Sequence, residues 1–290
     1  MSAPSASEAV RFRARDGREL SGMLLGARAP RGALLVNAAT GFAHAFYSDF
    51  ARYCAERGYH TLIYDYRGIG ASAASPLSKE SARMSDWGRL DMPAALDFLA
   101  AHGPGLPLVT VGHSVGGQLI GAMDNEARAR AHVMIAVSSG YWRYELVPFR
   151  FLALALWHLY GPLMLASIGY VPRGAVWRGE PLPPAVFRQW RAWCLQPTPF
   201  GPSLDPEFAD SRFAEVRTPL LSWGFSDDPI ATPRAIEALL ASYRRAPVER
   251  RTSHPAEVGA RRLGHHGFFF ARHRDSLWRG ALDWIDARCA

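Results

Sequence analysis

One serine stands in a setting that could make it a nucleophile. Residues 110–119 read TVGHSVGGQL, so Ser114 lies between Gly112 and Gly116 in the pattern G-x-S-x-G. A strand-like apolar run precedes the pattern and a small-residue helix is predicted to follow it, which is the context that the pattern requires. A serine on such a tight turn exposes its hydroxyl and brings helix N–H groups close to any oxyanion that forms beside it. We therefore predict that Ser114 is a nucleophile.

A serine hydroxyl reacts at neutral pH only if a histidine takes its proton and a carboxylate orients that histidine. Two later stretches offer these groups, in the chain order serine, acid, histidine. WGFSDDPIATP contains Asp227 and Asp228, and LGHHGFFF contains His265 and His266. The residue types alone leave both members of each pair open.

Short strands and helices alternate around these residues. Strands are predicted over residues 10–15, 19–25, 32–36, 59–65, 106–112, 131–140, 218–224 and 246–253. Helices are predicted over residues 44–58, 85–103, 115–126, 233–243 and 274–288. This alternation indicates an α/β fold with a mostly parallel sheet and helices on both faces. The carboxyl ends of parallel strands would bring the serine, aspartate and histidine stretches to one edge.

The alternation is interrupted by residues 141–210, which show no convincing strand. Five of the nine tryptophans lie there, namely Trp142, Trp157, Trp177, Trp190 and Trp193. We therefore predict an α/β core formed by residues 1–140 and 211–290, and a helical, aromatic-rich lid inserted over residues 141–210.

Residues 151–171 contain no Asp, Glu, Lys or Arg and are long enough to span a bilayer. Gly161 and Pro162 predict a break into two shorter helices. A single crossing would separate Ser114 from the later aspartates and histidines by a bilayer. We therefore expect no transmembrane span, but a lid that can rest on a membrane surface as a peripheral contact.

Several separated motifs resemble the α/β-hydrolase superfamily: NAATG (residues 37–41), DYRGIGAS (65–72), GHSVGGQ (112–118), SGYW (139–142) and GHHGFFF (264–270). The resemblance runs from about Val10 to the C-terminus, outside the insertion. The combination of these motifs further resembles an uncharacterised bacterial branch of predicted hydrolases, related to serine aminopeptidases and monoacylglycerol lipases. Asp65 and Arg67, in the second motif, are expected to brace a turn.

The resemblance assigns roles to particular residues. Ser114 would be the nucleophile. Asp228 would be the acid because DPIATP resembles the family pattern D-x-I-V-x-P, with Asp227 as the alternative. His265 would be the base because it follows a glycine as in the family's G-H-x-G-F, with His266 as the alternative.

The resemblance also implies two backbone N–H groups that would stabilise an oxyanion. One belongs to Val115 and the other to the loop after the third strand. Many family members have His-Gly in that loop, where this sequence has Asn37-Ala38. We expect Ala39 to supply the second donor, with Thr40 as the alternative.

These assignments predict a serine hydrolase that cleaves a carboxylic ester or thioester with a hydrophobic part through an acyl-enzyme, with no cofactor. An acyltransferase, an amidase or a peptidase would use the same three residues. A noncatalytic binder of hydrophobic ligands would need only the pocket, and fold alone does not choose among these functions.

Composition narrows the range of partners. The net charge of +7 comes from arginines that are scattered and form no patch, so we expect no nucleic-acid partner. Cys54, Cys194 and Cys289 have neither metal-type spacing nor a disulfide framework, and no metal is expected. The first 17 residues contain no apolar run typical of a secretory signal, and a cytoplasmic location is expected.

Overall fold

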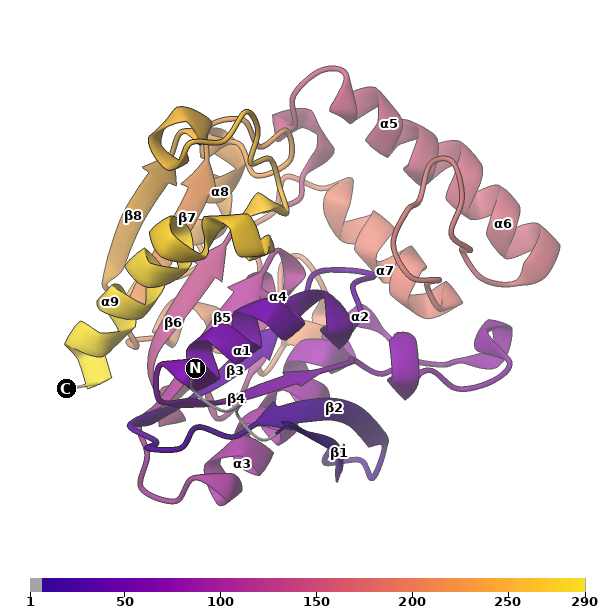
Figure 1. Ribbon diagram of the computed structural model, residues 1–290. Coiled ribbons are helices and arrows are strands. Elements are labelled where there is room, and N and C mark those ends of the chain that lie inside the picture. The colour runs from indigo at the N-terminus through magenta and orange to yellow at the C-terminus, as the bar shows by residue number, and fades with distance from the viewer. Residues whose placement is uncertain (1–6, 290) are drawn as a thin grey trace.

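A mixed sheet of eight strands organises the molecule, shown as a computed structural model in Figure 1, and the structure describes residues 7–289. The strands follow the order β1-β2-β4-β3-β5-β6-β7-β8, with β2 antiparallel to both neighbours and the other pairs parallel. They are β1 (Ser7–Arg13), β2 (Glu19–Leu25), β3 (Gly32–Asn37), β4 (Tyr59–Tyr64), β5 (Leu108–His113), β6 (Ala129–Ile135), β7 (Leu220–Phe225) and β8 (Val248–Ser253). The predicted mostly parallel sheet is confirmed.

The central strands are buried on both sides. Every residue of β3 and β5 is buried. Since successive side chains of a strand point to opposite faces, both faces must be covered. The main covering helices are α1 (Ser48–Glu56), α3 (Met92–His102), α8 (Pro233–Leu240) and α9 (Arg279–Cys289). By contrast, β8 at the edge of the sheet is mostly exposed or half-buried, as its charged sequence VERRTS requires.

Several of the predicted helices are less regular in the structure, two of them most clearly. The helix expected over residues 115–126 is an α-helix only in α4 (Val115–Gln118) and continues as a 3-10 helix over Leu119–Ala122. Glycines weaken a helix, and the backbone of Gly121 lies against the ring of Phe213, where a regular side chain would not fit. The helix expected over residues 85–103 comprises α2 (Met84–Asp86), a π-helical turn and α3.

The chain between β6 and β7 adds no strand to the sheet and carries three helices, α5 (Phe149–Ala155), α6 (Gly161–Ile168) and α7 (Pro184–Cys194). The predicted break at residues 161 and 162 is wrong, because a π-helical turn over Leu156–Tyr160 joins α5 to α6 without interruption. Proline lacks an N–H and its ring collides with a carbonyl one turn earlier in a regular helix. The wider π turn just before Pro162 accommodates both effects.

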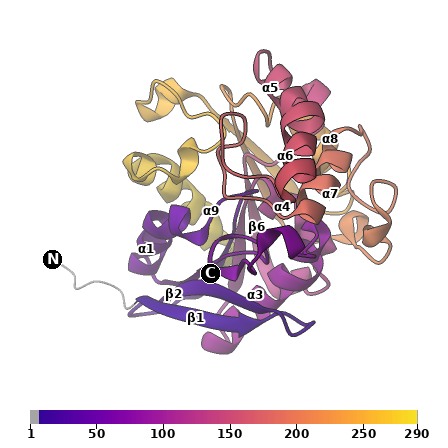
Figure 2. The ribbon, with the colours of Figure 1, turned by 90° about the vertical axis from the view of Figure 1, so that its right-hand side faces the viewer.

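Figures 1 and 2 place this continuous helix at the end of the molecule opposite β1 and β2. In Figure 1 it lies beyond the carboxyl ends of the parallel strands, with α7 beneath it. The three helices are therefore positioned over the edge of the sheet where the predicted site residues should gather.

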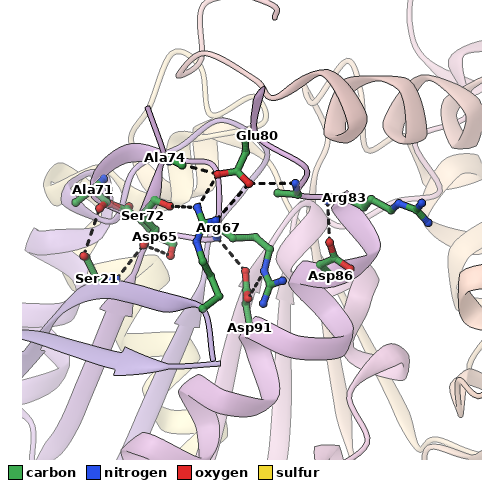
Figure 3. Close-up of polar contacts among 12 residues, drawn as sticks. Ser21, Asp65, Arg67, Ala71, Ser72, Ala74, Glu80, Arg83, Asp86 and Asp91 are labelled. Atoms are coloured by element: carbon green, nitrogen blue, oxygen red, sulfur yellow. Dashed lines mark hydrogen bonds and ion pairs between the residues drawn. The ribbon is translucent and has the colours of Figure 1, made fainter. Parts of the chain in front are cut away.

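A buried polar network holds the turn after β4 (Figure 3). The carboxylate of Asp65 accepts hydrogen bonds from the N–H groups of Ala71 (2.8 Å) and His44 (2.6 Å). The guanidinium of Arg67 donates to the buried carboxylate of Asp91 at 2.7 Å. These contacts give Asp65 and Arg67 the bracing role expected from the sequence.

Candidate active site

Ser114 lies at the sharp turn between β5 and α4, with φ 51° and ψ −117°. Such a conformation costs a residue other than glycine about 1–3 kcal/mol and persists only where its surroundings enforce it. The neighbouring glycines make the turn possible. A Cβ on Gly112 would lie 2.5 Å from the carbonyl oxygen of Gly116, and a Cβ on Gly116 would collide with the carbonyl oxygen of Asn37.

The structure brings Asp228 and His265 into direct contact. Nδ1 of His265 lies 2.8 Å from Oδ2 of Asp228, and both side chains are buried. Oδ1 of the same aspartate accepts hydrogen bonds from the N–H groups of Ile230 (2.8 Å) and Ala231 (3.0 Å). Burial alone would raise the pKa of Asp228, but the charge of His265 and these hydrogen bonds outweigh burial and lower the pKa. The carboxylate therefore stays ionised and directs Nε2 of His265 away from itself.

Asp227 has a different task from its neighbour. Its carboxylate accepts hydrogen bonds from the N–H groups of Leu263 (2.9 Å) and Gly264 (3.0 Å), which immediately precede His265. The two aspartates thus act on the same loop, Asp227 through its backbone and Asp228 through the imidazole.

A chain of hydrogen bonds connects the loop after β3 with the loop that carries His265. The N–H of Ala39 donates to Oη of Tyr47 (2.8 Å), and Oη lies 2.9 Å from Nδ1 of His113. Nε2 of His113 lies 2.9 Å from the carbonyl oxygen of His265. A carbonyl only accepts, so Nε2 carries the hydrogen.

The protonation state of His113 completes that chain. Burial, reinforced by the imidazoles of His266 and His265, lowers the pKa of His113 well below its ordinary value. The ring is therefore neutral, and its Nδ1 accepts a hydrogen bond from the hydroxyl of Tyr47. Tyr47 was not singled out in the sequence, because nothing in its local pattern indicates a partner 66 positions away.

The same chain corrects the expected oxyanion donor. Because the N–H of Ala39 is already bound to Tyr47, it is not available to a substrate. The next residue, Thr40, is buried and lines the cavity beside Ser114. Val115, the other expected donor, is the first residue of α4. The geometry therefore favours Thr40, the alternative, together with Val115.

Ser114 and His265 line one cavity of about 400 Å³, together with His266. Much of its wall is apolar and comes from the segment between β6 and β7: Phe149, Leu152, Leu156, Trp157, Trp177 and Trp190. The tryptophan-rich segment between β6 and β7 thus forms much of the surroundings of the candidate nucleophile.

Three histidines in this region are close enough to share a metal ion. Ligand atoms of His113, His265 and His266 lie within 4.8 Å of one another. However, both ring nitrogens of His113 already contact Tyr47 and the backbone of His265. Binding a metal there would break the chain that positions His265, so this donor set does not fit a resident metal.

The sheet order, the serine turn after β5 and the paired aspartate and histidine define an α/β-hydrolase architecture. A family model described as "Serine aminopeptidase, S33" matches residues 28–167. The chain has the α/β-hydrolase fold, and the family model, which covers just under half of the chain, supports a hydrolase.

Solved structures with the same fold include three hydrolases of low sequence identity. The α/β hydrolase GrgF from Penicillium sp. sh18 is 19% identical, with a TM-score of 0.63 over 98% of this chain and 99% of its own. An esterase from Pyrococcus furiosus is 12% identical, with a TM-score of 0.64 over 99% and 92%. A thermostable carboxyl esterase from Bacillus coagulans is 13% identical, with a TM-score of 0.61 over 98% and 99%. A search of curated proteins produced no match.

Proposed function

We propose that the protein is a serine hydrolase that cleaves a carboxylic ester or thioester with a hydrophobic part. One observation carries this proposal: Ser114, on its strained turn, and His265, held by Asp228, line the same largely apolar cavity. The solved structures named as esterases lend further support to an ester substrate.

The reaction would proceed through an acyl-enzyme. Nε2 of His265 takes the proton from Oγ of Ser114 as that oxygen attacks the carbonyl carbon. The N–H groups of Val115 and Thr40 stabilise the negative charge on the carbonyl oxygen. The tetrahedral intermediate then expels the alcohol or thiol, which takes the proton from His265. Water attacks the acyl-enzyme with His265 as base, releasing the free acid and restoring the serine.

The apolar wall of the cavity is expected to favour esters with a longer acyl chain. Burying one methylene group is worth about 0.8 kcal/mol, so the four additional carbons of a hexanoyl group are worth up to about 3 kcal/mol relative to acetyl. We expect kcat/KM for p-nitrophenyl hexanoate to exceed that for the acetate by about 10- to 200-fold. Release of p-nitrophenol measures both rates.

Equal kcat/KM values for the two esters would contradict a hydrophobic substrate. Product analysis in the presence of a primary alcohol separates the remaining chemistry. Free hexanoic acid supports hydrolysis, whereas a hexanoyl ester of the added alcohol as the main product would indicate an acyltransferase. Faster cleavage of the matching p-nitroanilide would indicate an amidase or peptidase.

The continuous helix has an exposed apolar face. Among residues 7–289, Phe149–Ile168 is the one helix long and apolar enough to cross a membrane, and only 22% of its most apolar window is buried. Phe151, Leu159 and Leu163 are 62%, 71% and 62% exposed. These positions are spaced by multiples of four residues and so lie along one side of the helix.

We propose that this side rests on an anionic membrane surface and that the helix does not cross it. A crossing would pull away a helix whose other side lines the cavity of Ser114 and His265. Residues 146–179 contain the arginines Arg150, Arg173 and Arg178 and no Asp or Glu, and this positive charge complements anionic lipid headgroups; Arg173 also pairs with Glu180 at 3.2 Å.

Cosedimentation with vesicles tests this surface. We expect binding to vesicles of phosphatidylglycerol and phosphatidylcholine to fall at least about tenfold when Leu159 and Leu163 are both replaced by glutamate, because two exposed apolar side chains are lost and two negative charges that the anionic lipids repel are added. Replacing the exposed Glu237, on α8, by glutamine is the matched control. Equal binding by the double variant and the wild-type protein would refute the membrane contact.

A further inference from the structure

The cavity wall contains a buried carboxyl group that the proposed reaction does not use. Glu145 lines the same cavity as Ser114 and His265, and the residue is only 5% exposed. Its Oε2 atom is inaccessible to solvent and has no hydrogen-bond partner within the described part of the chain. Leaving a buried polar atom unpaired costs about 1–3 kcal/mol. Glu145 lines the cavity, so a ligand group there that pairs with its carboxyl group would satisfy a hydrogen bond that the protein leaves open.

Glu145 is held firmly by the residues on either side of it. The carbonyl oxygen of Tyr144 accepts a hydrogen bond from Oγ1 of Thr232 at 2.7 Å. The N–H of Leu146 donates to the carbonyl oxygen of Pro229 at 2.8 Å. Both partners belong to the loop that carries Asp228. The position of Glu145 is therefore tied to that of the candidate triad.

The structure gives the carboxyl of Glu145 no ion-pair partner within the described residues. Arg150, whose charge acts on Glu145, directs its Nη2 to the carbonyl oxygens of Arg143 (2.8 Å) and Glu145 (2.9 Å). Cys194, on α7, is a buried neutral thiol because burial raises its pKa well above the ordinary value. Burial and the negative charge of Asp228 raise the pKa of Glu145 to about 8, and Arg150 opposes this rise only partly. Near neutral pH the carboxyl is mainly protonated and can donate a hydrogen bond.

Gln118 shows the contrasting arrangement. It also lines the cavity, but its amide nitrogen donates to the carbonyl oxygen of Ser138 at 2.5 Å. Glu145 thus offers a hydrogen-bonding group that the surrounding protein does not use.

We propose that Glu145, as a neutral carboxylic acid, donates a hydrogen bond to an uncharged oxygen in the substrate, away from the bond that is cleaved. This inference rests on the proposed function and narrows its substrate class to esters whose hydrophobic part carries a keto, hydroxyl or second ester oxygen. An uncharged oxygen suits the site because an ammonium group would have to lose its hydration in a largely apolar cavity.

Matched esters test the hydrogen bond. We expect the better of p-nitrophenyl 4-oxohexanoate and 5-oxohexanoate to show a kcat/KM about tenfold above that of the plain hexanoate at pH 7, which corresponds to about 1.4 kcal/mol. Glu145→Gln keeps an N–H donor and should keep the preference, whereas Glu145→Leu should reduce it to within about twofold. The exposed Glu237→Gln is the control and should behave like the wild-type protein.

The pH dependence separates the acid from an amide donor. A carboxyl with a raised pKa is neutral and able to donate below about pH 8, and it loses its proton above that value. The preference for the keto ester should therefore fall above pH 8 in the wild-type protein and stay constant in Glu145→Gln. All rates are compared as ratios at each pH, so that common effects on the reaction cancel.

Binding to the Ser114→Ala variant makes the two proposals separable. Trp157, Trp177 and Trp190 line the cavity, so their fluorescence reports binding of intact esters. Tighter binding of a keto ester without turnover by the wild-type protein would support Glu145 and reject the hydrolase proposal. Turnover without a keto preference, a preference that survives in Glu145→Leu, or a stronger preference for a trimethylammonium hexanoate ester would overturn the role of Glu145.

Discussion

Replacing Ser114 by alanine is expected to lower kcat for p-nitrophenyl hexanoate by about 10⁴-fold or more and to abolish labelling by a fluorophosphonate probe. The reason is that no other group at the turn after β5 can form the acyl-enzyme, while binding and oxyanion stabilisation alone retain only a small part of the rate. Hydrolysis rates and mass spectrometry of the labelled peptide measure the two effects.

The control for this prediction is Ser276→Ala, which removes an exposed hydroxyl on the turn before α9. It should label and react like the wild-type protein. Labelling of folded Ser114→Ala to the wild-type extent, or at a different residue, would exclude Ser114 as the nucleophile.

Replacing Asp228 by asparagine is expected to lower kcat by about 10³- to 10⁴-fold. The amide is uncharged, so it neither stabilises the imidazolium of His265 nor holds the tautomer in which Nε2 is free to accept a proton. Steady-state kinetics of the hexanoate ester, together with a thermal melt to verify folding, measure this effect.

Asp227→Asn is the matched comparison, because it makes the same chemical change one residue away. The amide oxygen can still accept one of the two hydrogen bonds from Leu263 and Gly264, and the contact of Asp228 with His265 is unchanged, so we expect a loss of less than about tenfold. A larger loss in Asp227→Asn than in Asp228→Asn would reverse the two roles.

The sequence predicts those parts of the structure that depend on local pattern. The central parallel strands β3 and β5 are apolar runs, and the carboxyl ends of the parallel strands meet at one edge because of the way parallel sheets are connected. The glycines around Ser114 predict the tight turn from the sequence alone. A resemblance to family motifs selects Asp228 and His265 from their neighbours, and the structure brings these two side chains to 2.8 Å.

The parts that escape sequence analysis depend on contacts between distant segments. Ala39 is excluded as a donor by Tyr47, which is bound in turn to His113. The helix continues past Pro162 because a π turn precedes it, and such a turn is not visible in apolar periodicity. Nothing in the sequence distinguishes Glu145 from the other glutamates, because its burial depends on the fold. Burial and pairing are properties of the assembled chain.

The chain of hydrogen bonds from Ala39 through Tyr47 and His113 to the backbone of His265 has a further consequence. It connects the loop that contains Ala39 to the loop that carries His265, so that a movement of one loop displaces the other. Groups within one such network do not contribute independently. A disturbance at either end would therefore alter proton transfer and charge stabilisation together. The contributions of proton transfer and of charge stabilisation to the activation free energy are therefore not additive.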